Sequence, residues 1–256
     1  MCADTATVHV HPLGDFCVAV AQDLMQLAVL HDSEANNTLI QSLKQTGFPN
    51  TLGLRLQSQN AHDAMTLVEQ ALAEMPDPID EQDTDELAVD YAAIYLTHTY
   101  RASPNESVWI DEEHLERQQS MFEVREYYHR YGLGAADWRK RADDHMVLQL
   151  HFLAHLFGEE QRDDVFTTAA QFMDDHLLRW LMLFANRVAG RCATPFYAGI
   201  NLLTGTYCEE LRDILADILE EPRPTTEEIE ARIQQDKTVS VDVPMPFIPG
   251  AGGPSW

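Results

Sequence analysis

Apolar residues recur at intervals of three and four along most of this chain, and that spacing constrains its fold more than any other feature. Met65, Val68, Leu72 and Met75 form one such series. Residues at these intervals share one face of an α-helix. Strand signals are few, with 239–243 as the best candidate. The pattern predicts an all-α fold, with helices near residues 15–30, 65–75, 87–95, 111–132, 146–158, 165–184 and 195–219, and a short polar helix at 225–236.

Breaks between these series indicate how the chain is organised. A helix from about Asp111, with Leu115 and Phe122 on its apolar side, is expected to end at Gly132, the usual helix-stopping residue. A glycine-containing stretch and the charged run at 139–141 follow, and together they predict a hinge. We therefore expect an N-terminal helical part over 1–140, a C-terminal helical part over 141–221, and a Pro-rich C-terminal extension over 222–256.

The C-terminal extension mixes a polar helix with an apolar end. Thr225 and Glu228 have the spacing of a capping box, which would open the polar helix. Beyond it, Phe247, Ile248 and Trp256 are more apolar than a solvated tail requires. Two interpretations stay open: part of the tail lies across an apolar groove, or it is a loose terminus.

The net charge restricts the possible partners. Forty-two acidic residues face seventeen basic ones, which gives a net charge of −25 at pH 7. Such a chain is repelled by nucleic-acid backbones and by anionic membrane surfaces. A basic partner, or simple solubility, agrees with the charge. No Lys or Arg occurs between Arg55 and Arg101, so one edge of the N-terminal half is predicted to be continuously acidic and suited to a basic peptide.

Cysteine usage and the absence of targeting signals point to the cytoplasm. The four cysteines form no CxxC pair and are too few for a disulfide framework, so reduced thiols are expected. No Lys or Arg precedes Lys44, although a secretory signal begins with a positive segment. No run of eighteen or more apolar residues occurs, so no membrane span and no direct membrane insertion are predicted.

Sequence motifs for catalysis are missing, but a group of histidines allows one alternative. There is no Gly-rich phosphate loop, GxSxG, HExxH or dinucleotide fingerprint. His151 and His155 stand four residues apart and share a helix face, with His145 shortly before them. They could serve a helical-bundle metal-binding enzyme or sensor. No second copy of a di-iron motif accompanies them, which favours packing or surface histidines.

Two further features suggest a binding role. Asp143 and Asp144 stand directly before an apolar helix, where one of them could cap the free N–H groups. A cap needs only one aspartate, so the second aspartate and the adjacent His145 are not explained by capping. This favours a binding role for these side chains at a hinge cleft. Trp109 follows a Pro-containing loop and precedes a polar stretch. Aromatic residues at such junctions often line peptide grooves, although most aromatics at helical spacing belong to the core.

Three segments in the same order resemble one known family. They are DYAAIYL at 90–96 with PNESVW at 104–109, the Asp-Asp-His sequence at 143–145 with the helix after it, and the FMDDHLLRW helix at 172–180. Together they resemble the TorD/DmsD/NarJ-like chaperones that mature molybdenum enzymes. Asn105 replaces an aromatic residue of the family pattern, and Arg141-Ala142 stand where Glu-Pro normally precedes the Asp-His pair.

The resemblance implies a non-enzymatic, all-helical chaperone of two parts joined at the Asp-His hinge. Such a chaperone binds the twin-arginine leader and the apo catalytic subunit of a reductase or dehydrogenase of the DMSO reductase family. It holds that subunit in the cytoplasm until its molybdopterin guanine dinucleotide is inserted. The protein itself is expected to need no cofactor, beyond a possible transient contact with that of its client. Some members form domain-swapped dimers, so a monomer or such a dimer is expected.

The expected leader contacts combine acidic and apolar side chains. Glu106, Asp143 and Asp144 are candidates for pairing with the leader's arginines. Tyr91, Tyr95 and Trp109 are candidates for an apolar wall. The full set of candidate leader-binding and partner-binding residues is Tyr91, Tyr95, Pro104, Glu106, Ser107, Trp109, Asp143, Asp144 and His145.

Overall fold

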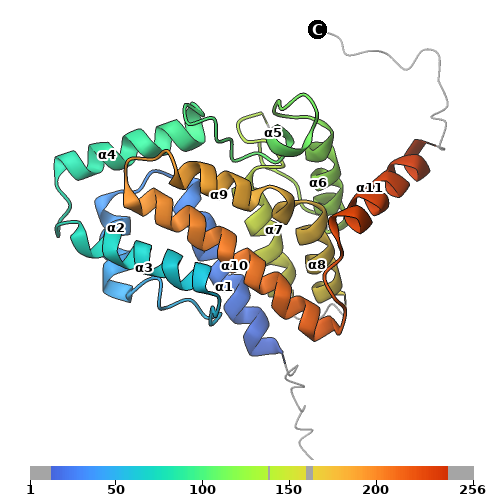
Figure 1. Ribbon diagram of the computed structural model, residues 1–256, viewed down its shortest axis with the longest axis horizontal. Helices are drawn as coiled ribbons and strands as arrows, with labels where there is room; N and C mark the ends of the chain where they lie inside the picture. Colours follow the sequence, from blue (N-terminus) through green and yellow to red (C-terminus); the bar gives the residue numbers. More distant parts are fainter. Residues whose placement is uncertain (1–12, 138, 160–163, 242–256) are drawn as a thin grey trace, which may run out of the picture. The chain divides into compact units, whose positions relative to one another are not determined.

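The computed structural model describes residues 13–137, 139–159 and 164–241 of the chain, and side chains as far as residue 235 (Figure 1). Within these ranges it contains eleven α-helices, one π-helical and one 3-10 segment, and no strand. The predicted all-α fold is confirmed. Residues 1–222 and 223–256 form two compact units. The expected boundary at residue 141 lies inside the first unit, and that subdivision stays a prediction.

The first unit contains every helix except the last. Its elements are α1 (Gly14–Asp32), α2 (Asn37–Thr46), α3 (Gln59–Glu74), α4 (Glu81–Tyr91), η1 (Ala92–Leu96), α5 (Ser107–Ile110), α6 (Gln119–Arg130), α7 (Met146–Gly158), α8 (Val165–Asp175), η2 (Leu177–Arg179), α9 (Leu181–Ala189) and α10 (Pro195–Leu219). The second unit contains α11 (Thr226–Val241).

Helix α10 is the central element of the first unit, and it packs against α3, α8 and α9. Its side chains from Phe196 to Leu215 supply much of the buried core. Two glycines allow the close approach of its neighbours. A Cβ at Gly199 would lie 2.8 Å from Val68 Cγ2 of α3, and a Cβ at Gly205 would overlap the Met182 side chain of α9. A larger residue at either position would force these helices apart.

Several predicted helices are confirmed at the positions that periodicity indicated. The elements α1, α3, α7 and α10 bury the expected apolar faces. The capping box is also present: the Thr225 N–H donates to Glu228 Oε2 over 2.8 Å, and the Glu228 N–H donates to Thr225 Oγ1 over 3.3 Å. Helix α11 continues to residue 241, so the strand candidate at 239–243 is wrong for 239–241. The apolar end of the tail lies outside the described residues.

The helix expected from Asp111 is wrong in its first part. The α-helix begins only at Gln119, and Leu115 is 57% exposed. The cause is local: Asp111 Oδ2 accepts a hydrogen bond of 2.6 Å from the hydroxyl of Ser120 in the first turn of the helix, which closes residues 111–118 into a loop. The helix ends as expected before Gly132, which adopts a φ of +69°. Phe122, expected on the apolar side, is 48% exposed.

The long helix expected over 165–184 is broken in the middle. Helix α8 ends at Asp175 and α9 begins at Leu181, with the 3-10 segment η2 between them. The break falls at His176, whose backbone leaves the helical region (φ −125°, ψ −79°). The ring of His176 bonds to Glu106, a residue seventy positions earlier. The helix break therefore depends on a distant contact that apolar periodicity does not show.

Candidate functional site

Two loops that lie far apart in the sequence meet beside each other at the centre of the candidate site. Residues around 105 and 145 form an isolated antiparallel bridge. The Met146 N–H donates to the Pro104 carbonyl over 2.8 Å, and the Glu106 N–H donates to the Asp144 carbonyl over 3.2 Å. The structure thus brings together six of the nine predicted residues: Pro104, Glu106, Ser107, Asp143, Asp144 and His145.

Asp144 is fully buried and caps a different helix from the one expected. Its Oδ2 accepts a hydrogen bond of 2.8 Å from the N–H of Ser107, the first residue of α5. The expected aspartate cap of α7 is wrong, because the ring Nδ1 of His145 accepts the Val147 N–H there over 3.2 Å. Burial holds the pKa of His145 well below its ordinary value, so the ring is neutral. Burial also raises the pKa of Asp144 to about 6, against hydrogen bonds from Ser107 that lower it.

This raised pKa gives a testable dependence of stability on pH. Because the pKa of Asp144 is higher in the folded protein than in an unfolded chain, the folded state binds the proton more tightly. The contribution of Asp144 to stability is therefore greatest near pH 4 and is lost as the pH rises to about 6. Asp144→Asn removes this dependence. The stability of the variant relative to the wild type should rise by about 2–3 kcal/mol between pH ~4 and ~7 in urea titrations. A difference that does not change with pH contradicts the assignment.

Glu106 is fully buried and links three segments of the fold. Its Oε1 pairs with His176 Nδ1 over 2.8 Å, and its Oε2 accepts 2.6 Å from the Gln149 side-chain amide of α7. Burial lowers the pKa of His176, but the charge and hydrogen bond of Glu106 outweigh burial and leave that pKa raised. The pair is therefore a buried ion pair that joins the loop before α5 to the start of η2.

Asp143 is also paired within the protein. Its Oδ2 accepts from the Arg125 guanidinium of α6 over 2.6 and 3.0 Å, and its backbone carbonyl accepts from Tyr128 Oη over 2.9 Å. Only 2% of Asp143 is exposed. The three carboxylates predicted to bind arginines therefore have partners inside the fold. In this conformation they hold the two loops together rather than facing solvent.

Tyr91 and Tyr95 lie in a second buried cluster. Tyr95 Oη bonds to His31 Nδ1 over 2.6 Å, and burial lowers the pKa of His31 to about 3, so that ring is neutral. Tyr91 Oη donates to the Asp32 carbonyl over 3.0 Å. Phe184 connects this cluster to Trp109, with ring centroids 6.5 Å from Tyr95 and 6.4 Å from Trp109. Only the third predicted aromatic, Trp109, reaches the surface.

Trp109 lies at an open pocket, which we call the Trp109 pocket, with a volume of about 640 Å³. Its indole N–H donates to the Ser103 carbonyl over 2.8 Å, and the Arg187 guanidinium of α9 stacks 4.6 Å from the ring centroid. Leu115 and Leu183 are each 57% exposed at the same pocket. The complete lining is His98, Arg101, Ser103, Val108, Trp109, His114, Leu115, Glu116, Leu183 and Arg187.

The loops around the Trp109 pocket have unusual backbone conformations. His98, Arg101 and His114 all have φ between +51° and +52°. Three of the five non-glycine residues with positive φ in the described chain therefore line this one pocket. Such conformations cost energy in non-glycine residues and occur often at ligand-binding sites. No sequence signal identified these positions, because neither histidine nor arginine is restricted to left-handed turns.

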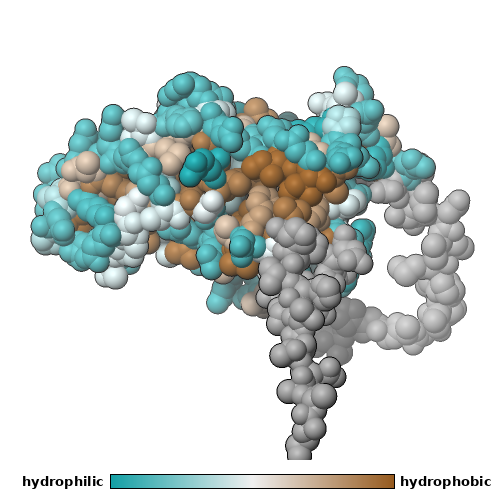
Figure 2. All heavy atoms as spheres, turned by 90° about the horizontal axis from the view of Figure 1, so that it is seen from below, coloured by the Kyte–Doolittle hydropathy of each residue, from teal (hydrophilic) through white to brown (hydrophobic). Residues whose placement is uncertain are grey.

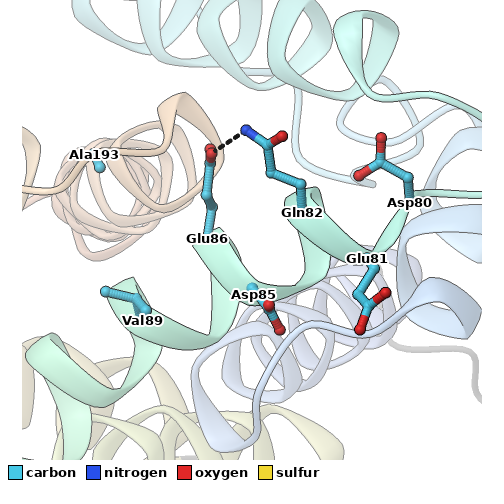
Figure 3. A pocket seen from close by; sticks show the side chains of 7 residues that line it. All are labelled: Asp80, Glu81, Gln82, Asp85, Glu86, Val89 and Ala193. Carbon is cyan, nitrogen blue, oxygen red and sulfur yellow. Dashed lines mark hydrogen bonds between the residues drawn. The ribbon is translucent and has the colours of Figure 1, made fainter.

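A second pocket, of about 650 Å³, carries the predicted acidic edge, and we call it the α4 acidic face. Figure 3 shows Glu81 and Asp85 on the same side of α4, while Glu86 is bonded to Gln82 over 2.9 Å. Val89 is 63% exposed at the end of this face. The complete lining is Asp80, Glu81, Gln82, Asp85, Glu86, Val89 and Ala193.

Asp90 fixes α4 against the loop that closes this pocket. Its carboxylate accepts from the Thr194 N–H and hydroxyl, each over 2.6 Å, from the Ala193 N–H over 3.0 Å, and from Tyr100 Oη over 2.7 Å. Asp90 thereby also holds Thr194, the residue directly before α10. The first residue of the DYAAIYL segment thus has a structural role that positions the α4 acidic face.

The alternative based on histidines gains no support. His145 caps α7, while His151 and His155 are half-exposed on that helix. Within residues 13–137, 139–159 and 164–241, no group of three or more His, Cys, Asp or Glu side chains is arranged to hold a metal ion. In the same ranges, no helix is both long and apolar enough to cross a bilayer.

Comparison with known proteins finds one matching family model. Residues 61–186 match the sequence model of the nitrate reductase delta subunit family. The match covers helix α4, Trp109 and the two loops around residues 105 and 145. Together with the all-α fold, this match supports the resemblance to the molybdoenzyme maturation chaperones.

Several similar curated proteins carry the name Chaperone protein TorD. That of Photobacterium profundum is 27% identical, with 48% of this chain and 61% of the relative covered. That of Vibrio cholerae serotype O1 is 27% identical, with 56% and 68% covered. That of Vibrio parahaemolyticus serotype O3:K6 is 25% identical, with 48% and 61% covered. The chain thus spans less than two thirds of the length of two of these relatives. Their name is that of a chaperone rather than an enzyme, as expected for this chain.

Proposed function

We propose that this protein is a cytoplasmic chaperone for a molybdenum enzyme of the DMSO reductase family. It binds the twin-arginine leader and the apo catalytic subunit, and delays export until the molybdenum cofactor is inserted. The observation that carries the proposal is the presence of both an acidic pocket and a pocket with an exposed aromatic and apolar lining, formed by neighbouring stretches of the sequence. Residues 80–89 and Ala193 line the α4 acidic face, and residues 98–116 with Leu183 and Arg187 line the Trp109 pocket.

The two surfaces suit the two parts of a twin-arginine leader. Carboxylates on the α4 acidic face can pair with guanidinium groups in bidentate fashion, and their field speeds the approach of a basic peptide. The Trp109 pocket offers an apolar floor to the apolar helix-forming stretch that follows the arginines. Val89, at the end of the α4 acidic face, is 63% exposed, and Leu96, which follows in the sequence before the Trp109 pocket, is 66% exposed.

The predicted site residues then divide into two groups. Trp109 contacts the leader, together with Leu115 and Leu183, which the sequence did not indicate. The buried members hold the loops that shape the pocket: Tyr91, Tyr95, Pro104, Glu106, Ser107, Asp143, Asp144 and His145. The chaperone needs no cofactor of its own for this task, and the molybdenum cofactor belongs to the client.

Neutralising the α4 acidic face tests the electrostatic part of the proposal. In the variant Glu81→Gln, Asp85→Asn, Glu86→Gln, the affinity for a synthetic twin-arginine leader should fall and lose most of its salt dependence. The matched control removes three exposed charges from other helices: Asp63→Asn, Glu126→Gln, Asp217→Asn. Calorimetric titration at low and high ionic strength compares the two. Equal losses in both variants would show that only the overall charge matters.

Removing the indole tests the apolar part. Trp109→Ala should weaken leader binding by at least about tenfold, because a half-buried aromatic in a pocket is a typical hot spot. Leu183→Ala should have a smaller effect in the same direction. Circular dichroism checks that the helical content is unchanged. Unaltered affinity in Trp109→Ala would remove the pocket from the proposed site.

A further inference from the structure

Helix α1 exposes an apolar face that neither the core nor the proposed leader site uses. Three of the eight large apolar side chains exposed in the described chain lie on this helix: Val18 is 49% exposed, Met25 46% and Val29 47%. Exposed residues follow one another along α1 at intervals of three and four, which is the spacing of a coiled-coil seam. We call this series the α1 stripe: Asp15, Val18, Gln22, Met25, Val29 and Asp32.

The α1 stripe carries no charge between its two terminal aspartates. In a chain with a net charge of −25, an uncharged exposed face of this length is unexpected for a helix that only meets water. Exposed apolar surface of this kind typically marks a site of interaction with another protein. Figure 2 shows that apolar side chains gather on one face of the molecule.

Helix α7 continues the same surface. It packs against α1 in the antiparallel direction, because Phe157 near its end lies 6.2 Å from Phe16, and Arg141 before its start pairs with Asp32. Its half-exposed side chains are Leu148, His151 and His155, again at intervals of three and four. Burial lowers the pKa of His151, so its ring adds no charge at neutral pH.

The α1 stripe is self-complementary when reversed. Its residue types read Asp, Val, Gln, Met, Val, Asp, and its intervals read the same in both directions. If a second α1 lies antiparallel to the first, Val18 faces the second copy's Val29, and Gln22 faces its Met25. Asp15 then meets the second copy's Asp32, which Arg141 already neutralises. A twofold symmetric interface requires this kind of match between a surface and itself.

We infer that the α1 stripe is the interface of a homodimer in which two copies of α1 pack antiparallel. This interface exchanges no segment between copies, and it leaves the α4 acidic face and the Trp109 pocket free. Since both copies are strongly acidic, their mutual repulsion weakens the dimer at low ionic strength. Added salt should therefore strengthen the dimer, whereas it should weaken the binding of a basic leader.

Charged substitutions at paired positions test both the interface and its direction. Sedimentation equilibrium of the full chain should show a dimer. Val18→Glu with Val29→Glu should raise the dimer dissociation constant by at least about a hundredfold, because like charges then meet twice. Val18→Lys with Val29→Glu should restore the dimer, because each introduced lysine then faces the introduced glutamate of the partner.

Val89→Glu is the matched control, since it charges an exposed valine on another helix. It should leave the dimer intact, and circular dichroism should show unchanged helical content in all variants. A wild-type chain that stays monomeric at every concentration overturns the inference and assigns the face to another protein. A dimer that survives the double glutamate variant also overturns it, and points to a segment-swapped or other interface. Failure of the lysine–glutamate variant to restore the dimer rules out the antiparallel arrangement.

Discussion

Arg212→Met is expected to lower the free energy of unfolding by about 3–5 kcal/mol, because it leaves a buried carboxylate without its partner. Arg212 of α10 and Asp174 of α8 are each 4% exposed. Their two hydrogen bonds measure 2.9 Å from Nε to Oδ1 and 2.8 Å from Nη2 to Oδ2. The pair therefore fixes α8 to the central helix α10. Urea denaturation of Arg212→Met measures the free energy of unfolding that is lost with the pair.

The double variant Asp174→Leu, Arg212→Met removes both charges. It therefore separates the contribution of the ion pair from the cost of burying one unpaired charge. Replacing both charges by apolar groups of similar volume should restore most of the lost stability, since a buried ion pair often contributes little against such a replacement. A loss below about 1 kcal/mol in Arg212→Met would show that water reaches Asp174.

Glu106→Ala is the second substitution with a large expected effect. Glu106→Ala removes the carboxylate that accepts hydrogen bonds from His176 and from the side-chain amide of Gln149. Both groups are buried, and Glu106 raises the pKa of His176. The expected loss is about 3–5 kcal/mol in urea denaturation. Glu106→Gln keeps an acceptor oxygen and removes the charge, so this variant should lose less stability than Glu106→Ala.

The same variants decide whether Glu106 touches the leader. Because Glu106 is 0% exposed, we expect Glu106→Gln to retain the wild-type affinity for the leader wherever the protein is folded. Weaker leader binding by more than about tenfold with unchanged stability would instead make Glu106 a direct contact. That outcome would require the loops around residues 105 and 145 to open when the leader binds.

Apolar periodicity predicted the helices whose ends depend on local sequence. The boundaries of α3, α7 and α10 follow from residues within or beside each helix, such as Ser58, Gly158 and Pro195. The break at His176 could not be predicted in this way, because it depends on Glu106. The loop at 111–118 was missed because Leu115 and Phe122 have the spacing of a helix face while being exposed.

The candidate site was predicted only in part, for a physical reason. The resemblance identified residues around 105 and 145 that the fold indeed joins. Their burial depends on partners such as Arg125 and His176, which only the packed structure reveals. The exposed side of the site comes instead from Leu115 and Leu183. In the sequence, both resemble ordinary core residues.

Titration of the full-length chain with a synthetic twin-arginine leader tests the central claim most directly. We predict saturable binding that weakens as the ionic strength rises, and that is reduced when both arginines of the peptide are replaced by glutamine. The arginines supply the charge that the α4 acidic face recognises, and the apolar stretch alone retains only the contacts of the Trp109 pocket. Absence of binding, or equal binding of both peptides at every ionic strength, would contradict the proposed role as a leader-binding chaperone.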